Sequence, residues 1–183
     1  DIADIDNIDV VIELVGGSEG VAKELVEKAI TNGKSVITAN KALVATHGNN
    51  IGELVAKHGV MFGYEAAVAG GIPIIKTIRE GLASNRLRKI YGILNGTCNY
   101  ILSVMRETGQ EFEDILADAQ RLGYAEADPS FDVDGVDAAH KLAILSAIAF
   151  QTPINFSGVY VEGITLISPI AVSYTHLTLP TTL

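Results

Sequence analysis

The chain has 183 residues, of which 48% are hydrophobic, and its formal net charge is −9. This length suits one large domain or parts of two. The acidic balance, without a basic cluster, argues against nucleic acid or an anionic membrane as a partner. No signal peptide opens the chain, no apolar run is long enough to span a bilayer, and the single cysteine can form no internal disulfide. These features predict a cytoplasmic protein.

The first third of the chain alternates apolar runs with amphipathic ones. Strands are predicted at 8–17, at 35–40 and from residue 60, and helices at 19–31 and 51–57. Strands and helices that alternate at this spacing indicate βαβ units and a parallel sheet. A dinucleotide-binding fold normally opens with a strand and a G-x-G-x-x-G loop, and this sequence contains no such loop. We therefore expect an α/β fold that holds the C-terminal half of a Rossmann-type sheet.

After Gly70-Gly71 the pattern changes to that of an α+β domain. Pro73 precedes a helix predicted over 74–82. A strand predicted over 86–97 ends at Thr97, which is a suitable N-cap for a helix through Glu107. Further helices are predicted at 112–122 and 136–150, and a last strand at 157–164. We therefore assign the cofactor domain to 1–69 and a substrate-binding domain to 70–168.

The last residues do not fit this organisation. The string VSYTHLTLPT at 172–181 matches, residue for residue, an in-frame translation of a transposon adapter used in sequencing libraries. We therefore expect residues 169–183 to be a non-native tail, like a fusion scar. Tyr174 and His176 would then carry no chemistry. A genuine terminal strand is the alternative.

The most informative stretch is GYAEADPSFDVDGVDAAHK, from Gly123 to Lys141. The helix that follows it is apolar nearly all round, which is typical of a buried helix. Asp137 and Lys141 are four residues apart and therefore share a face of that helix. Burial makes the pKa of a lysine tunable, so the pair is a candidate active site. An ordinary ion pair on a helix surface remains the alternative.

The acidic loop before that helix has two further interpretations. Its spacing resembles a calcium-binding EF-hand loop, but the position that needs a bidentate glutamate is Lys141, which argues against calcium. Asp132 or Asp134 is also suited to cap the helix. We expect capping to apply to one of the two.

Three other positions carry candidate chemistry. Cys98 is expected near a helix N-terminus, where a thiol pKa is lowered. One interpretation is a nucleophile with His140 as its base. The favoured interpretation is a small buried residue beside a helix cap. Lys41 follows a strand at its carboxyl end, where open α/β sheets bind ligands. Glu65 and the AVAGG that follows it form a tight glycine-rich corner.

Taken together, the chain resembles the homoserine dehydrogenase family from about residue 9 to 167. The segments that carry the resemblance are ELVGG, TANKALV, YEAAVAGGIPII, LNGTCNYIL and GYAEADPSFDVDGVDAAHKLAIL. The resemblance implies NAD- or NADP-dependent interconversion of L-homoserine and L-aspartate 4-semialdehyde, in the pathway to threonine and methionine. It also implies a homodimer of the full-length protein.

The resemblance also implies roles for individual residues. Lys141 would exchange a proton with the substrate oxygen, and Asp137 would orient the substrate and that lysine. Glu126 and Asp132 would hold the substrate's amino group, and Lys41 would lie beside nicotinamide and substrate. The remaining implied contacts are Gly16 and Gly17 with the cofactor, and Glu65, Val68, Gly70 and Ile72 around a monovalent cation, Na⁺ or K⁺.

The sequence also departs from the family. The glycine fingerprint and the residue that chooses between NAD and NADP are missing, as is the region after Ile167. We therefore expect this chain alone neither to bind dinucleotide tightly nor to turn over. Another Rossmann-type semialdehyde reductase and a catalytically inactive binding homologue are the rival interpretations.

Overall fold

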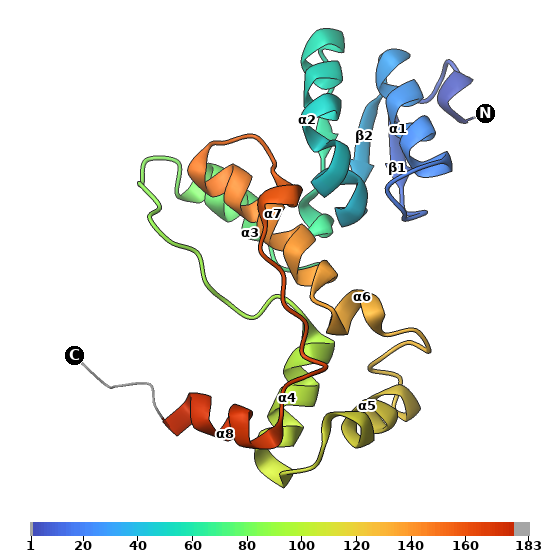
Figure 1. Cartoon of the computed structure of the whole chain (residues 1–183). Coiled ribbons are helices and arrows are strands. Elements are labelled where there is room, and N and C mark those ends of the chain that lie inside the picture. Colours follow the sequence, from blue (N-terminus) through green and yellow to red (C-terminus); the bar gives the residue numbers. More distant parts are fainter. Residues whose placement is uncertain (1, 178–183) are drawn as a thin grey trace. The chain divides into compact units, whose positions relative to one another are not determined.

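Figure 1 shows the computed structural model, which describes residues 2–177, with side chains as far as residue 173. The chain forms two compact units. The first unit contains residues 2–91 and 140–159, and the second contains residues 92–139 and those from 160 onwards. Helix α7 (Val136–Phe150) contributes residues to both units. Within the described residues, no helix is long and apolar enough to cross a membrane.

The first unit is built on a parallel three-stranded sheet in the order β1-β2-β3. Its strands are β1 (Val10–Glu13), β2 (Ser35–Thr38) and β3 (Phe62–Gly63). Helix α1 (Val21–Thr31) connects β1 to β2, and α2 (Lys41–His58) connects β2 to β3 (Figure 1). The predicted βαβ units and parallel sheet are therefore confirmed. A 3₁₀ turn, η1 (Ile2–Asp4), precedes β1.

One face of this sheet carries the core of the first unit. The strand at 8–17 was expected to be buried, but burial alternates along β1, so only one of its faces is covered. Val10, Ile12 and Ile37 lie exposed on the other face. Helices α1 and α2 supply most of the packing against the covered face. The buried residues of this core are Ala3, Val11, Val26, Ala29, Ile30, Val36, Leu43 and Ile51.

Helix α2 begins ten residues earlier than its predicted start at residue 51, at Lys41. The side chain of Asn40 caps it by accepting a hydrogen bond from the Leu43 amide at 3.1 Å. The stretch of His, Gly and Asn residues at 47–50, interpreted as a loop, is helical because the buried face formed by Leu43, Val44 and Ile51 outweighs the weak helix propensity of those residues. The helix ends at Gly59, which adopts the left-handed conformation.

The strand predicted from residue 60 is much shorter than expected. After β3 the chain turns through a 3₁₀ turn, η2 (Glu65–Ala67), and a corner in which Ala69 and Gly71 have positive φ angles of 52° and 84°. Then follow α3 (Ile74–Lys76) and a π-helical turn, η3 (Thr77–Gly81). The helical segment predicted at 74–82 is thus present, with a change of hydrogen-bonding pattern in its middle.

The second unit is helical in the residues that the structure describes. It contains α4 (Gly96–Thr108), α5 (Phe112–Arg121), α6 (Ser130–Val133) and α8 (Pro169–Leu177), besides the first turn of α7. The helices predicted at 97–107 and 112–122 are confirmed within two residues at each end. Their buried residues form a core of their own, which consists of Ile101, Met105, Phe112, Ile115, Ala119, Ala125, Val133 and Val172.

The strands predicted at 86–97 and 157–164 are wrong in this structure, because neither segment is assigned to a strand. The second segment begins in the 3₁₀ turn η4 (Phe156–Gly158), and its Ile164 amide bonds to the Val133 oxygen at 2.8 Å. A strand needs a neighbouring ladder, and large side chains such as Tyr91 and Tyr160 are exposed on these segments.

Part of the predicted tail can be compared with the structure. Helix α8 covers its first nine residues, and Val172 packs into the core of the second unit. Residues 178–183, and the side chains of Tyr174 and His176, lie outside the described residues.

Candidate active site

Two of the acidic residues singled out in the sequence are joined by one asparagine in the second unit. The Asn95 Nδ2 group donates to Asp132 Oδ1 at 2.7 Å and to Asp137 Oδ2 at 2.8 Å. Asn95 is 9% exposed and Asp137 only 3%. The partners come from three elements, since Asn95 precedes α4, Asp132 belongs to α6 and Asp137 lies in the first turn of α7. The folded chain thus brings carboxylates together around a single amide.

The start of α4 adds two more groups to this network. Asn95, and not Thr97 as expected, caps the helix, because its Oδ1 accepts a hydrogen bond from the Cys98 amide at 2.8 Å. The Thr97 hydroxyl lies 3.2 Å from Asp132 Oδ2 and 3.0 Å from the main-chain oxygen of Tyr124. The Asp132 carboxylate therefore accepts hydrogen bonds from side chains at the start of α4. That one of Asp132 and Asp134 caps α7 stays a prediction.

The environment of Cys98 excludes the lowered thiol pKa that was considered from the sequence. Burial, followed by the negative charges of Asp132 and Asp137, raises the pKa of Cys98 to about 11. Its Sγ donates a hydrogen bond to the main-chain oxygen of Asp132 at 3.2 Å. A thiol with this pKa is almost entirely protonated near neutral pH. The favoured interpretation of Cys98, a small residue beside a helix cap, agrees with these contacts.

Helix α7 carries the Asp–Lys pair. It spans Val136–Phe150, as predicted, and Asp137 is buried at its start. Lys141 is half-buried and lies about one turn further along, on the same side of the helix as Asp137. His140, which was considered as a base for Cys98, is buried with its ring 4.3 Å from that of Phe156 in the first unit.

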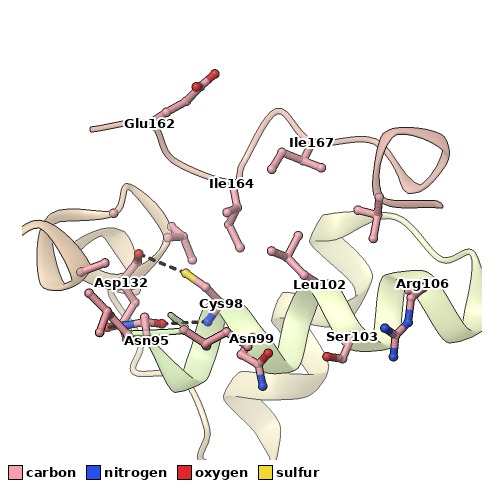
Figure 2. Close-up of a pocket in the computed structure, with 16 residues that line it drawn as sticks. Asn95, Cys98, Asn99, Leu102, Ser103, Arg106, Asp132, Glu162, Ile164 and Ile167 are labelled. Atoms are coloured by element: carbon pink, nitrogen blue, oxygen red, sulfur yellow. Dashed lines mark hydrogen bonds between the residues drawn. The ribbon is translucent and has the colours of Figure 1, made fainter. Parts of the chain in front are cut away.

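A cavity of about 550 Å³ adjoins the network within the second unit. Figure 2 shows Asn95 and Asp132 at one end and Ser103 and Arg106 at the other. The wall between them is mostly apolar, and includes Leu102, Ile164 and Ile167. Asp137 and Glu126 are not among its lining residues. Asp132 thus belongs both to the hydrogen-bonded network and to the wall of this cavity.

The first unit holds a second polar network, centred on Glu13. This carboxylate is 1% exposed. Its Oε1 accepts hydrogen bonds from the amides of Val15 at 2.7 Å and Gly16 at 3.1 Å, and its Oε2 accepts one from the Thr38 hydroxyl at 2.6 Å. Burial alone would raise the pKa of Glu13, but the donors from Thr38, Gly16 and Val15 outweigh it and lower the pKa below its ordinary value.

The Glu13 network shapes the loop that was assigned to the cofactor. Thr38 Oγ1 accepts from the Asn40 amide at 2.9 Å, and Asn40 Nδ2 donates to the Gly17 oxygen at 2.7 Å. Gly16 and Gly17 both have positive φ angles, of 86° and 81°, which other residues rarely adopt. Lys41 is half-buried in the first turn of α2, directly after Asn40. The carboxyl ends of β1 and β2 are thereby tied together.

The corner after β3 is held by Glu65. Its two carboxylate oxygens accept hydrogen bonds from the amides of Ile75 and Lys76, each at 2.9 Å. The carboxylate is therefore used in capping α3 and its continuation.

The structure groups some of the predicted residues and leaves others apart. Asp132 and Asp137 share a network in the second unit, and Gly16, Gly17 and Lys41 are neighbours of one in the first. Glu126 is exposed, and its main-chain oxygen accepts a hydrogen bond from the Gln120 side chain. The residues at the centres of the two networks, Asn95 and Glu13, were missed. Their signals were an asparagine before a helix and an acidic residue inside an apolar strand.

Two family models match the chain. Residues 1–65 match the model described as "Homoserine dehydrogenase, NAD binding domain", and residues 73–178 match the model described as "Homoserine dehydrogenase". Together with the parallel βαβ sheet, these matches define the class of the protein as α/β with a Rossmann-type NAD-binding domain. Within that class, the chain belongs to the homoserine dehydrogenase family.

Similar proteins support the same family. Homoserine dehydrogenase from Pseudomonas aeruginosa is 59% identical over 95% of this chain and 40% of its own length. The crystal structure of a homoserine dehydrogenase from Thiobacillus denitrificans is 58% identical, with a TM-score of 0.90 over 93% of this chain and 39% of its own. A hyperthermophilic archaeal homoserine dehydrogenase in complex with NADPH is 30% identical, with a TM-score of 0.77 over 87% of this chain and 48% of its own. The chain spans about 40% of the length of the curated relatives it matches.

Proposed function

We propose that the full-length protein interconverts L-homoserine and L-aspartate 4-semialdehyde with NAD or NADP as the hydride carrier. The observation that carries the proposal is the buried Asp132–Asn95–Asp137 network, whose Asp137 stands one helical turn before Lys141. It supplies fixed negative charge for an ammonium group, next to the helix that bears a proton-exchanging lysine. Family membership favours homoserine over other amino-alcohols as the substrate.

Lys141 is the acid and base of the proposed reaction. In the oxidation, the hydroxyl proton of homoserine passes to the Lys141 amine, the hydroxyl-bearing carbon loses a hydride, and a carbon–oxygen double bond forms. When bound, NAD(P) supplies the hydride acceptor. In the reverse direction the Lys141 ammonium donates the proton to the developing alkoxide. One well-placed acid/base group contributes roughly 10²–10⁴ in rate, and Asp137 keeps the lysine oriented.

The substrate's amino group is assigned to Asp132 and Glu126. A charge that holds the ammonium fixes the reacting carbon against the nicotinamide, and correct positioning contributes to the rate in its own right. Asp132 is supported by its fixed geometry, because Asn95 and Thr97 both contact its carboxylate. Glu126 is solvent-exposed and free to reorient towards a ligand.

The cofactor is assigned to the loop of Gly16 and Gly17 and to Lys41. Glycines with positive φ let a backbone approach a ligand closely, and the carboxyl ends of parallel strands are where such sheets bind ligands. Glu13 and Asn40 support this assignment, since they hold the loop from β1 and α2. Binding of NAD and binding of NADP both fit these residues.

A monovalent cation, Na⁺ or K⁺, fits the corner after β3. The main-chain oxygens of Glu65, Val68, Gly70 and Ile72 would hold it, which agrees with the use of the Glu65 carboxylate in capping. Neutral oxygens suit a singly charged ion, and positive φ angles at Ala69 and Gly71 turn successive peptide groups in different directions. The ion would stabilise the corner between β3 and α3.

Several wider assignments belong to the same proposal. The enzyme would serve the pathway to threonine, methionine and isoleucine, in the cytoplasm, as a homodimer. The domains would be divided at 1–69 and 70–168, with a non-native tail at 169–183 that the coding nucleotide sequence would test. The chain of 183 residues alone would be inactive, because the relatives it matches are more than twice as long.

The test is a full-length enzyme in which residues 1–168 replace the aligned segment of the Pseudomonas aeruginosa relative. We expect this chimaera to oxidise homoserine with NAD or NADP, and Lys141→Ala to lower kcat by about 10²–10⁴ with cofactor affinity near normal. Lys57→Ala is the matched control, since Lys57 is an exposed lysine on α2. Steady-state kinetics and cofactor titration measure both effects.

Four outcomes would contradict the proposal or a part of it. An unchanged kcat in Lys141→Ala would remove that residue from the mechanism. A chimaera that prefers another amino-alcohol would favour a different semialdehyde reductase, and one that binds cofactor without turnover would favour an inactive binding homologue. Robust reduction of aspartate semialdehyde by the 183-residue chain would refute its expected inactivity.

A further inference from the structure

We propose that Asn95 is a positioning residue of the active site, which holds the carboxylates of Asp132 and Asp137 in one fixed arrangement. The inference rests on the proposed function, because it assigns a task to a residue beside groups already given roles there. Its starting observation is that one side-chain amide donates to both carboxylates, at 2.7 and 2.8 Å. These partners lie 37 and 42 residues further along the chain.

The orientation of the Asn95 side chain is determined by its third hydrogen bond. Its Oδ1 accepts from the Cys98 amide at 2.8 Å, as the N-cap of α4. The two ends of an amide are chemically different, and the hydrogen-bonding network decides which is which. With the oxygen committed to the helix, both hydrogens of Nδ2 face the carboxylates. The thirteen residues of α4 thus serve as the rigid support of the network.

The two carboxylates need such a donor because they repel each other. Two like charges that share a poorly solvated site destabilise each other's ionised form, so that one of them takes up a proton or the two side chains move apart. Asp137 is 3% exposed and Asp132 is half-buried, so water compensates them only in part. A shared NH₂ group supplies one hydrogen bond to each carboxylate and so offsets part of their repulsion. The carboxylate of Asp132 is thereby held in place for an ammonium group, and that of Asp137 for the Lys141 side chain.

Thr97 shows that the task is specific to Asn95. Its hydroxyl reaches Asp132 at 3.2 Å and the main-chain oxygen of Tyr124 at 3.0 Å. Asn95 is in contact with Asp132 and with Asp137. Loss of Asn95 should therefore disturb substrate binding and proton transfer together, and loss of the Thr97 hydroxyl should disturb binding alone.

Asn95→Asp is the variant that separates positioning from capping. Aspartate is nearly the same size and is as good an N-cap as asparagine, so the bond from the Cys98 amide is retained. The two donated bonds are lost, and a third carboxylate then faces Asp132 and Asp137. In the chimaera described above, we expect kcat/KM for homoserine to fall at least tenfold at pH 8, with kcat and KM both affected.

The pH profile gives the readout that a purely structural role would not move. Neighbouring carboxylates raise the pKa of the introduced aspartate. Once protonated it carries an O–H and can again donate one hydrogen bond. The ratio of variant to wild-type kcat/KM should therefore rise several-fold between pH 8 and pH 6. Capping strength, in contrast, does not improve when an aspartate is neutralised.

Two further variants complete the experiment. Thr97→Val should raise KM for homoserine with kcat within about twofold of wild type. Asn155→Asp is the matched control, because Asn155 caps η4 by accepting from the Gly158 amide at 3.1 Å and is exposed. It should leave kcat/KM unchanged at both pH values.

The outcomes distinguish the inference from the proposed function. An inactive wild-type chimaera would refute the proposed function. An active one in which Asn95→Asp loses less than threefold, or loses equally at pH 6 and pH 8, would overturn the inference. If Asn95→Asp does not fold, Asn95→Ser decides, since serine caps well but is too short to reach both carboxylates. A loss of more than threefold at an unchanged Tm supports the inference, and a smaller loss overturns it.

Discussion

The two polar networks of this molecule differ in how hydrogen-bond donors are shared among carboxylates. In the first unit, the single carboxylate of Glu13 receives hydrogen bonds from the amides of Val15 and Gly16 and from the Thr38 hydroxyl. In the second unit, the single amide of Asn95 serves two carboxylates. In the first network three donors serve one carboxylate, whereas in the second a single amide is shared between two carboxylates. The first therefore suits a structural role, and the second retains negative charge that can attract a cationic group.

The two networks shift the pKa of a neighbouring or central group in opposite directions. Despite its burial, Glu13 has a lowered pKa, because its donors stabilise the ionised form. Beside Asp132 and Asp137, Cys98 has a pKa raised to about 11, first through burial and then through the charges of the two carboxylates. The donors around Glu13 stabilise its charge, whereas the charges of Asp132 and Asp137 raise the pKa of the neighbouring thiol. Substitutions in each network can test this contrast.

The largest effect is expected from Glu13→Ala. This change leaves the buried Thr38 hydroxyl and the amides of Val15 and Gly16 without their acceptor, and it empties space in the core. Losing three hydrogen bonds to a charged group and leaving the buried Thr38 hydroxyl without its acceptor should destabilise the protein by about 3 kcal/mol. Urea unfolding of the chain, followed by circular dichroism, measures the change. A loss below about 1 kcal/mol would mean that water replaces the carboxylate and that the network is not structural.

Glu13→Gln is the matched control, and its pH dependence tests the cause. A lowered pKa in the folded state gives stability that is present above the ordinary value of 4.5 and is lost as pH falls through the folded pKa. Glutamine keeps an acceptor for the amides but cannot ionise. The stability gap between wild type and Glu13→Gln should therefore narrow as the pH falls below 4.5. A gap that stays constant would exclude the charge as the source.

The second effect concerns the reactivity of Cys98, the only cysteine in the sequence. A shift from the ordinary value of 9.0 to about 11 lowers the thiolate fraction about a hundredfold near pH 8, since each pKa unit is a factor of ten. Alkylation by iodoacetamide should be slower than that of an unfolded control by at least this factor. Its rate should rise tenfold per pH unit up to about pH 11.

Asp132→Asn sharpens the measurement on Cys98. It removes one of the two charges that raise the thiol pKa and leaves Asp137 and the burial in place. Alkylation at pH 8 should then accelerate, although it should stay slower than in the unfolded control. No acceleration would mean that burial alone protects the thiol and that the second network exerts no field on its neighbours.

Apolar runs and the alternation of strands with helices predicted part of the fold. The bounds of α7 followed from an unbroken apolar run, and the parallel β1-β2-β3 sheet followed from alternating strands and helices. The early start of α2 was missed because its His, Gly and Asn residues are weak helix formers, and burial of the opposite face decided the outcome. The strands at 86–97 and 157–164 were wrong because pairing depends on a neighbour that apolar alternation alone does not supply.

The same division holds for the candidate site. Asp137 and Lys141 were singled out because residues four apart share a helix face, and the role of Asp132 came from the family resemblance. Asn95 was missed because it meets its carboxylates across 37 and 42 residues, a separation that carries no periodic signal. Glu13 was missed because an acidic residue at a strand end is usually solvated, and only the folded sheet places Thr38 beside it.

The smallest effect is expected at Glu65. Comparing it with Glu13 shows whether the number of hydrogen bonds or the burial of the carboxylate decides the loss of stability. Its carboxylate accepts amide hydrogen bonds from Ile75 and Lys76 at 2.9 Å, much as Glu13 accepts them from Val15 and Gly16, but Glu65 is only half-buried. Water can replace the lost acceptor there, so Glu65→Ala should cost about 1 kcal/mol, the usual value of a helix cap. Urea unfolding beside Glu53→Ala, an exposed glutamate on α2, measures it. A loss as large as that of Glu13→Ala would show that the number of hydrogen bonds, and not burial, makes the Glu13 network strong.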